Sequence, residues 1–253
     1  MTALEHVQRQ QPEGVPPLEL TGERTLPDVP AENYWFQRHL AVYRWIADRC
    51  GGLQVVDMAC GEGYGTDLLA RRAGSVTGVD ANPDAHEHAK LKYTRPGVRF
   101  VRELVETYEE PCDAVVFLQT IEHVERPEEV LDHFRSMLRP GGTAYVSTPN
   151  VLTLAPPGAE RSDNPWHLRE YRAHEFRALC ERNFHSVELL GLFHARKLRA
   201  HELALRLGWD SLHPAVGLTR PFYDWFTPAI SAKDFALRPA PIERALDFLA
   251  ILQ

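Results

Sequence analysis

Short apolar runs and stretches of helical period alternate along the middle of the chain. The apolar runs have the length of buried strands and lie at residues 53–58, 76–79, 98–101, 114–118 and 143–147. Helical patterns fill the gaps at residues 66–73, 83–93 and 127–138. Arg139-Pro140-Gly141-Gly142 then predicts a helix stop followed by a turn. This alternation predicts an α/β fold, in which helices cover both faces of a parallel sheet.

The two ends of the chain have a different pattern. Residues 33–50 have helical character, whereas the first thirty residues are rich in Pro, Gln and Glu and predict a flexible arm. Beyond Asn150 we expect a helix at 173–182, a strand at 187–192 and a last strand at 245–252, whose pattern also allows a short helix. We therefore predict one domain with residues 31–193 and 241–253 as its core. Residues 194–240 are expected to form a helical insertion that covers the site.

A glycine-rich turn follows the first predicted strand. Its sequence is Val55-Val56-Asp57-Met58-Ala59-Cys60-Gly61-Glu62-Gly63-Tyr64-Gly65, and its small residues let the backbone adopt positive φ and come close to a ligand. Asp57 places a carboxylate beside a helix N-terminus, whose amides favour negative or polar ligand groups. A dinucleotide site has G-x-G-x-x-G spacing, so the G-x-G-x-G spacing argues against a nicotinamide enzyme. Asp80 ends the second strand, where an acid can bind both ribose hydroxyls.

Four segments together carry a family resemblance. Asp57-x-Ala59-x-Gly61-x-Gly63, Asp80, residues 113–124 (DAVVFLQTIEHV) and Leu138-Arg139-Pro140-Gly141-Gly142 look like class I methyltransferases that use S-adenosylmethionine (SAM). Among these, the chain is most similar to the ubiquinone-biosynthesis branch. The resemblance implies a Rossmann-like, mostly parallel seven-stranded sheet with an antiparallel last strand. It also implies SAM as cofactor and S-adenosylhomocysteine as product. A carboxylate at Asp57 suits this cofactor, because SAM carries a positive sulfonium.

The resemblance also implies a set of cofactor-binding residues at the carboxyl ends of the first four strands. They are Asp57, Ala59, Cys60, Gly61, Gly63, Asp80, Ala81, Glu103, Leu104 and Gln119. The glycine-rich turn would line the methionine moiety, Asp80 would hold the ribose, and Gln119 would lie beside the cofactor. The family usually has Gly in place of Ala59, where a methyl group is tolerable. It usually has Asp where this chain has Glu103, the candidate partner of the adenine amine.

Further motifs are similar to a narrower group, the actinobacterial methyltransferases associated with glycan and methylglucose polysaccharide assembly. These motifs are Thr21-Gly22-Glu23-Arg24-Thr25, Tyr34-Trp35-Phe36, Ser147-Thr148-Pro149-Asn150, Asn164-Pro165-Trp166-His167 and Gly191-Leu192-Phe193-His194. This resemblance implies O-methylation of a hydroxyl on a sugar, polysaccharide or glycolipid precursor. Two alternatives stay open: methyl transfer to a nitrogen or carbon of a small molecule, and a SAM-binding partner of a glycan-assembly enzyme without catalysis.

Three histidines are candidates for the base that a hydroxyl acceptor needs, because its oxygen loses a proton as the methyl group arrives. His167 lies in the loop after the fifth predicted strand and is preferred over His194, which follows the sixth. His123 follows the fourth strand beside Glu122, where the pair could also serve only to orient loops. Glu170 could orient His167 or cap the next helix, and we favour the cap.

Net charge and cysteine usage restrict the binding partners and the cellular location that we expect. A formal net charge of −7 makes nucleic acid or an anionic membrane a poor partner. The four cysteines are far apart, and no secretory signal or membrane-length apolar run is visible, so we expect a cytoplasmic protein with free thiols. No group of His, Cys, Asp or Glu has metal-ligand spacing, so no metal is predicted, although scattered carboxylates could assemble a magnesium site in space. The expected partner is a small-molecule or saccharide acceptor, and a homodimer is possible.

Overall fold

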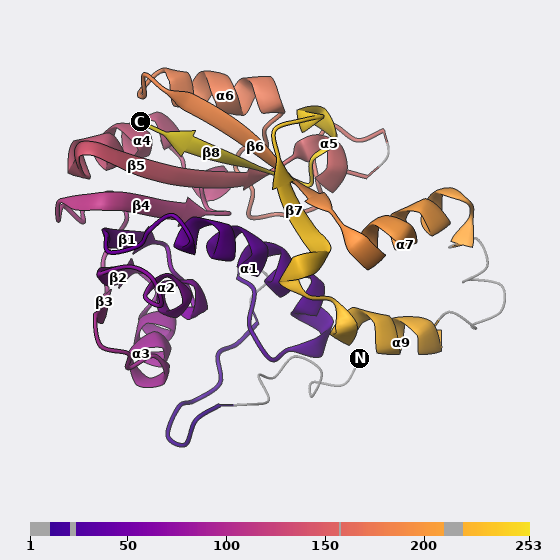
Figure 1. Cartoon of the computed structure of the whole chain (residues 1–253), viewed down its shortest axis with the longest axis horizontal. Coiled ribbons are helices and arrows are strands. Elements are labelled where there is room, and N and C mark those ends of the chain that lie inside the picture. The colour runs from indigo at the N-terminus through magenta and orange to yellow at the C-terminus, as the bar shows by residue number, and fades with distance from the viewer. Residues whose placement is uncertain (1–10, 21–23, 157, 210–219) are drawn as a thin grey trace.

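The computed structural model describes residues 11–20, 24–156, 158–209 and 220–253. Its strands form one sheet (Figure 1) and are β1 (Gln54–Met58), β2 (Ser75–Val79), β3 (Val98–Val101), β4 (Cys112–Leu118), β5 (Leu138–Pro149), β6 (Val187–His194), β7 (Phe235–Arg238) and β8 (Asp247–Leu252). The helices are α1 (Asn33–Ala47), α2 (Tyr64–Leu69), α3 (Pro83–Lys92), α4 (Pro127–Met137), α5 (Val151–Leu154), α6 (Ala173–Glu181), α7 (Arg196–Arg206) and α9 (Arg220–Ala229). Short 3-10 turns are η2 (Pro30–Glu32), η3 (Ile121–His123), η5 (Ala232–Asp234) and η6 (Ile242–Arg244).

The strand order within the described sheet is β3-β2-β1-β4-β5-β8-β6-β7. The strands from β3 to β5 are parallel, and β8 is inserted antiparallel between β5 and β6. The predicted α/β class, with a mostly parallel sheet and an antiparallel last strand, is confirmed. The four-residue edge strand β7 is an addition to the seven predicted strands, and residues 247–252 form a strand, not a helix. Parallel pairing brings the carboxyl ends of β1, β2 and β4 together, where ligands of such sheets bind.

Apolar side chains from one strand serve two separate cores. In β4, Val115 and Phe117 belong to the core beneath α4 and α6, where the Phe117 ring lies 5.0 Å from that of Phe134. The intervening Val116 belongs to the opposite core, with Ile46 of α1. Successive side chains of a strand point to opposite faces, so a fully apolar run is required when helices cover both. Figure 1 shows α4 and α6 on one side of the sheet and α1 and α2 on the other.

One predicted turn is wrong. Helix α4 does end before Arg139, as expected, but residues 139–142 continue into β5. Cys112 of β4 pairs with Leu138 and Ala114 pairs with Thr143, so the intervening residues of β5 bulge out of the ladder. Gly141 has φ of 82°, which allows the backbone to bulge without ending the strand.

Part of the segment predicted as an arm packs on the domain. Leu18, Leu26 and Val29 are buried in a small cluster, and the carbonyl of Pro16 accepts a hydrogen bond from His88 of α3 at 2.8 Å. Residues 1–10 and 21–23 of the predicted arm lie outside the described residues. Within the described part of the chain, no helix combines the length and apolarity that crossing a membrane requires.

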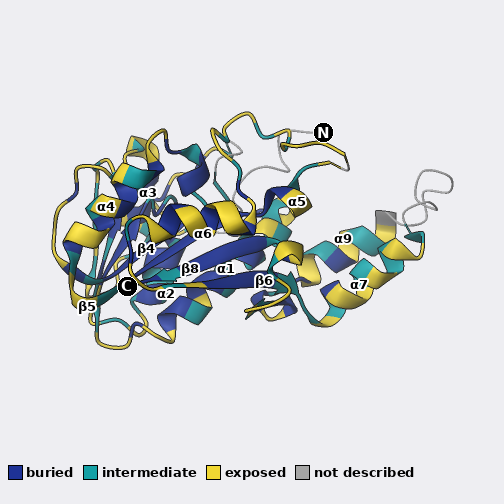
Figure 2. Ribbon diagram, turned by 90° about the horizontal axis from the view of Figure 1, so that it is seen from above, coloured by how far each residue is buried: buried dark blue, intermediate teal, exposed yellow. Residues whose placement is uncertain are grey.

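Helices α7 and α9 lie side by side and project beyond the sheet (Figures 1 and 2). His201 of α7 lies between rings of α9, with its centroid 4.9 Å from that of Phe226. Asn33 at the start of α1 donates to the carbonyl of Thr227 at 2.8 Å, which ties α9 to the core. These helices belong to the predicted insertion, whose residues 210–219 lie outside the described residues. Its role as a cover for the site stays a prediction.

Candidate functional site

Left-handed backbone shapes the turn between β1 and α2. Ala59, Gly61 and Gly63 have φ of 54°, 55° and 94°. A Cβ on Gly63 would lie 2.9 Å from the Cβ of Ala89, so close packing against α3 also requires glycine there. A Cβ on Gly61 would have no atom within 4 Å, so this part of the turn leaves room for a ligand. The amide of Cys60 donates to Val79 at 3.0 Å and joins the turn to β2.

Asp57 lies beneath the turn and is fully buried. Its Oδ1 accepts a hydrogen bond from the hydroxyl of Tyr43 at 3.1 Å, and its Oδ2 accepts one from Thr66 at 2.7 Å. Burial raises the pKa of this carboxyl to about 7, although both hydrogen bonds act to lower it. Asp57 therefore connects α1, β1 and α2 beneath the turn. Its direct contact with a ligand stays a prediction.

Glu62, within the same turn, points away toward α3. Its carboxylate accepts hydrogen bonds from Lys92 at 2.6 Å and from the hydroxyl of Tyr93 at 2.7 Å, and it faces His88 at 3.1 Å. The motif did not identify this role, because the spacing of small residues says nothing of the side chains between them. Glu62 holds the turn against α3 and so fixes where its backbone lies.

A cavity of about 630 Å³ lies at the carboxyl ends of β1 and β2. We call it the Asp80 cavity, and among the predicted residues Ala59, Asp80, Ala81 and Leu104 line it. The carboxylate of Asp80 accepts from the amides of Gly61 at 2.7 Å and Asn82 at 2.9 Å. Each oxygen keeps acceptor capacity, so the carboxylate can also bind ligand hydroxyls.

The sequence prediction misses part of the wall of the Asp80 cavity. Val105, Glu106 and Thr120 line it, whereas Glu103 is not among the described lining residues. Glu106 is thus an acid after β3 that lines the cavity, and the contact of Glu103 with the adenine amine stays a prediction. The third-strand loop carries several acids, and only the fold shows which of them faces the cavity.

A second cavity of about 400 Å³ adjoins the first. We call it the His167 cavity, and its wall includes Trp35, Arg38, Gln119, Glu122 and His167. Gln119 has a positive φ of 52°, and its amide donates to the hydroxyl of Ser147 at 3.0 Å. His123 lines both cavities, so they meet at this side chain.

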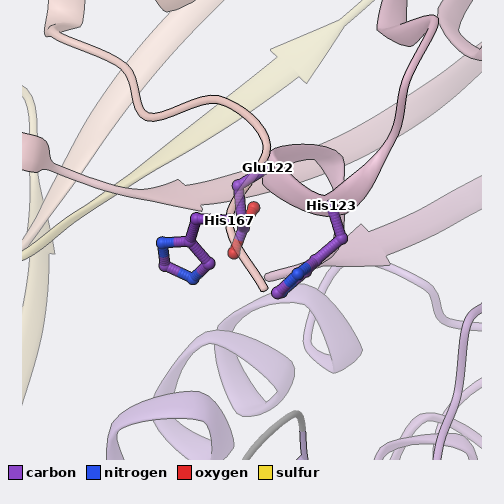
Figure 3. A group of neighbouring side chains, drawn as sticks. All are labelled: Glu122, His123 and His167. Carbon is purple, nitrogen blue, oxygen red and sulfur yellow. The ribbon is translucent and has the colours of Figure 1, made fainter. Parts of the chain in front are cut away.

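Two of the three candidate histidines come together at this junction. The ring centroids of His123 and His167 lie 5.0 Å apart, and the side chain of Glu122 lies beside them (Figure 3). Glu122 is buried and accepts a hydrogen bond from Thr148 at 3.0 Å. Burial raises the pKa of Glu122 to about 8, against the hydrogen bonds that lower it. The backbone carbonyl of Glu122 also accepts from Leu168, which fixes the loop that carries His167.

Glu170 orients His167, and the expectation that it caps the next helix is wrong. Nδ1 of His167 donates to Oε1 of Glu170 at 2.7 Å. The cap of α6 is instead formed by Glu175, whose carboxylate accepts from the amide of Arg172 at 2.7 Å. The turn at Ser162 brings Glu170 inward, since its amide and hydroxyl both donate to that carboxylate.

His194 lies elsewhere, at the end of β6. Its Nε2 lies 2.8 Å from the hydroxyl of Tyr34, and its Nδ1 faces Glu202 at 3.3 Å. Burial lowers the pKa of His194, and Glu202 opposes that shift. Among the described residues that line the two cavities, His194 does not occur. The structure thus groups His123 with His167 and separates them from His194.

Comparison with known proteins agrees with this geometry. A family model described as a methyltransferase domain matches residues 31–203. A protein of Mycolicibacterium smegmatis, described as a probable S-adenosylmethionine-dependent methyltransferase, is 39% identical over 92% of this chain and 94% of its own. A ubiquinone biosynthesis O-methyltransferase of Aeromonas salmonicida is 32% identical over 42% of this chain and 48% of its own.

A solved structure gives the same fold. A SAM-dependent methyltransferase of Thermotoga maritima, a possible histamine N-methyltransferase, superimposes with a TM-score of 0.58 over 88% of this chain and 95% of its own, at 16% identity. That identity supports the fold alone. The family model and the long alignment with the mycobacterial relative decide the family: this chain belongs to the SAM-dependent methyltransferases.

Proposed function

We propose that the protein transfers the methyl group of SAM to a hydroxyl oxygen of a sugar, polysaccharide or glycolipid precursor. The observation that carries this proposal is that the Asp80 cavity and the His167 cavity meet at His123. One cavity has the features of the cofactor site, and the other has the position of an acceptor site. S-adenosylhomocysteine leaves as the product.

The Asp80 cavity fits the cofactor. The carboxylate of Asp80 is available to ribose hydroxyls, and Gly61 leaves open space beside the turn. SAM would lie with its ribose at Asp80 and its methionine moiety along the glycine-rich turn. We expect the chain's own residues to contribute mainly by orientation, since aligned reactants save roughly 7–11 kcal/mol of the barrier.

The wall of the His167 cavity suits a saccharide. Trp35 is 39% exposed and offers an aromatic face. Arg24, Asp163 and Asn164 also line the cavity and supply donors and acceptors for ring hydroxyls. A cavity of about 400 Å³ is small, so one or a few rings at the end of a longer acceptor would enter it.

The hydroxyl would be activated at the wall formed by His123 and His167. A hydroxyl has to lose its proton as the carbon–oxygen bond forms, and this wall adjoins the cofactor side. His194 lies away from both cavities, so we give it no part in this step.

The test is release of S-adenosylhomocysteine from SAM with a panel of acceptors. The panel holds glucose and 3-O-methylglucose oligosaccharides, a lipid-linked saccharide, and small amines of similar size. Turnover with a saccharide, at least tenfold above the amines, supports the proposal. Turnover confined to amines would replace it with N-methylation. Tight SAM binding without turnover on any acceptor would favour the alternative that the protein binds SAM without catalysis, as a partner of a glycan-assembly enzyme.

A further inference from the structure

We infer that Glu122, His123 and His167 bind a divalent transition-metal ion, with zinc the best match to these ligands. Each offers one ligand atom, and these atoms lie within 4.8 Å of one another. Two imidazoles and one carboxylate form a common catalytic zinc set, which leaves a fourth position open. Magnesium prefers oxygen ligands and fits this set less well. The sequence predicted no metal, because His123 and His167 are far apart along the chain and only the fold joins them.

The second nitrogen of each histidine has the partner that a metal ligand requires. Nδ1 of His123 donates to the carbonyl of Trp166 at 2.9 Å, and Nδ1 of His167 donates to Glu170 at 2.7 Å. Both partners are acceptors, so each ring carries its proton on Nδ1 and its lone pair on Nε2. Metal-bound histidines usually donate their other N–H to a carboxylate or a backbone carbonyl in this way.

The side chain of Asn164 contacts the nitrogen of His167 that would bind the ion. Its Oδ1 accepts from the amide of Trp166 at 3.0 Å, so its Nδ2 is the atom that faces Nε2 of His167 at 3.0 Å. A donor therefore already occupies the lone pair that the ion would take. Binding requires Asn164 to withdraw, and the exchange replaces a neutral donor with a cation that interacts more strongly with imidazole.

The charges around the group permit a cation. The carboxylate of Glu122 is buried beside the two rings, and Thr148 supplies it with a neutral hydroxyl donor (Figure 3). Arg38 also lines the cavity, but its guanidinium is paired with Asp247 at 2.6 Å. Asp163 lines the same cavity and adds a further negative charge. A buried carboxylate among neutral donors is stabilised by a bound cation.

The catalytic consequence rests on the proposed function. The acceptor hydroxyl would take the open position of the ion, which lowers the pKa of a bound hydroxyl as it does that of bound water. Its proton passes to solvent, and the resulting alkoxide attacks the methyl carbon of SAM. One C–O bond forms and the C–S bond breaks, so the sulfonium becomes the thioether of S-adenosylhomocysteine. His123 and His167 then act as ligands, and neither has to receive the proton.

Metal binding can be tested without SAM or acceptor. The full chain is treated with a chelator, dialysed and titrated with Co²⁺, which gives visible absorption when bound by histidine. We expect one Co²⁺ per chain, displaced by Zn²⁺. His167→Ala and Glu122→Gln should each weaken binding by at least about 100-fold, and Glu170→Gln by about 10–100-fold. His174→Ala is the matched control, because His174 is exposed on α6, and its binding should equal that of the parent chain.

The outcomes separate this inference from the proposed function. Substoichiometric Co²⁺ uptake, or equal uptake by every variant, overturns the site. Thermal unfolding reports whether each variant is folded. If Glu122→Gln does not fold, the Co²⁺ titration of His167→Ala decides whether the site exists. Stoichiometric metal with no transfer to any hydroxyl leaves the site and removes the proposed function. Transfer to a saccharide that persists after complete metal removal keeps the proposed function and removes the catalytic role of the ion.

Discussion

Nδ1 of His167 lies 2.7 Å from Oε1 of Glu170. The other oxygen of Glu170 accepts from the amide of Ser162 at 2.8 Å. Burial acts to raise the pKa of Glu170, but the hydrogen bonds from Ser162 and His167 outweigh it, so its pKa lies below the ordinary value. The carboxylate is therefore an ionised acceptor that fixes the tautomer of His167. Nε2 of His167 becomes the nitrogen that acts at the cavity.

Replacement of His167 by alanine should lower turnover and leave cofactor binding intact. We expect kcat to fall at least about tenfold, because His167 lies at the wall where the acceptor hydroxyl has to be activated, and losing a group that assists this step costs about that much or more. The dissociation constant for SAM, measured by calorimetry, should change less than twofold, since the ring lies on the acceptor side. His194→Ala is the comparison, and an equal loss in both variants would remove His167 from the mechanism.

Replacement of Glu170 by glutamine should act through His167. An amide at this position accepts a weaker hydrogen bond than a carboxylate, so the ring is held less firmly. We expect a smaller loss of kcat than in His167→Ala, and no further loss when both substitutions are combined. Steady-state kinetics of the two single variants and the double variant measure this coupling. Additive losses would mean that Glu170 acts independently of His167.

Apolar patterning was sufficient for the parallel half of the sheet but not for its edge. The run that includes Val115, Val116 and Phe117 is apolar on both faces, and such a run is typical of a central parallel strand. Strand β7 has four residues, begins directly after the turn η5 and ends at the exposed Arg238. An edge strand this short has no periodicity to detect. Pairing with β6 stabilises it, and that partner is distant in sequence.

The site was predictable where the chemistry is local. Asp80 was identified because it ends a strand beside a glycine-rich turn, and the structure places it in the cavity. The meeting of His123 with His167 depends on a loop that returns across the carboxyl edge of the sheet, which no local pattern encodes. From the sequence, Glu170 could either orient His167 or cap the next helix, and both partners are close to it along the chain. The presence of Glu175 at the N3 position of α6 explains why capping did not need it.

Replacement of Asp57 by asparagine should remove a pH-dependent cost to stability. Burial raises the pKa of Asp57 to about 7 in the folded chain, from an ordinary value of 3.8. The folded state therefore binds this proton more tightly than the unfolded state. The associated stability is fully present below about pH 4 and is lost as pH rises through about 7.

We accordingly expect Asp57→Asn to gain in melting temperature relative to the parent chain by at least about 3 °C between pH 5 and pH 8.5. Thermal melts by circular dichroism at both values measure the difference. Asp132→Asn, at an exposed ion pair with Arg135, is the control and should show no such trend. A constant gap across pH would place the pKa of Asp57 near that of an unfolded aspartate.

Replacement of Gly65 by alanine should destabilise the fold. A Cβ at Gly65 would lie 2.2 Å from the ring of Tyr43, whose hydroxyl is held by Asp57. The ring cannot move away without breaking that hydrogen bond, and overpacking of this kind costs about 1–3 kcal/mol. Denaturant unfolding measures the loss. Gly51→Ala is the matched control, because a Cβ there meets no atom within 4 Å. Equal stability of the two variants would contradict the packing described here.

Loss of either partner of the buried ion pair between Arg38 and Asp247 should destabilise the fold more than replacement of both. Nε of Arg38 donates to Asp247 at 2.6 Å, Nη2 donates to the carbonyl of Leu246 at 2.8 Å, and both charged side chains are almost wholly buried. Removal of one partner leaves an uncompensated buried charge, so Arg38→Met should cost about 3–5 kcal/mol of unfolding free energy.

The double variant Arg38→Met with Asp247→Leu should recover most of that loss, because burying two apolar side chains carries no desolvation penalty. Chemical denaturation of the single and double variants measures both. Arg38→Lys is informative as well, since lysine keeps the charge but not the forked contact that joins α1 to the start of β8. Because Arg38 also lines the His167 cavity, the double variant should fold yet show a raised KM for the acceptor. If the double variant lost as much stability as the two single variants added together, Arg38 and Asp247 would stabilise the fold independently of each other and not as a pair.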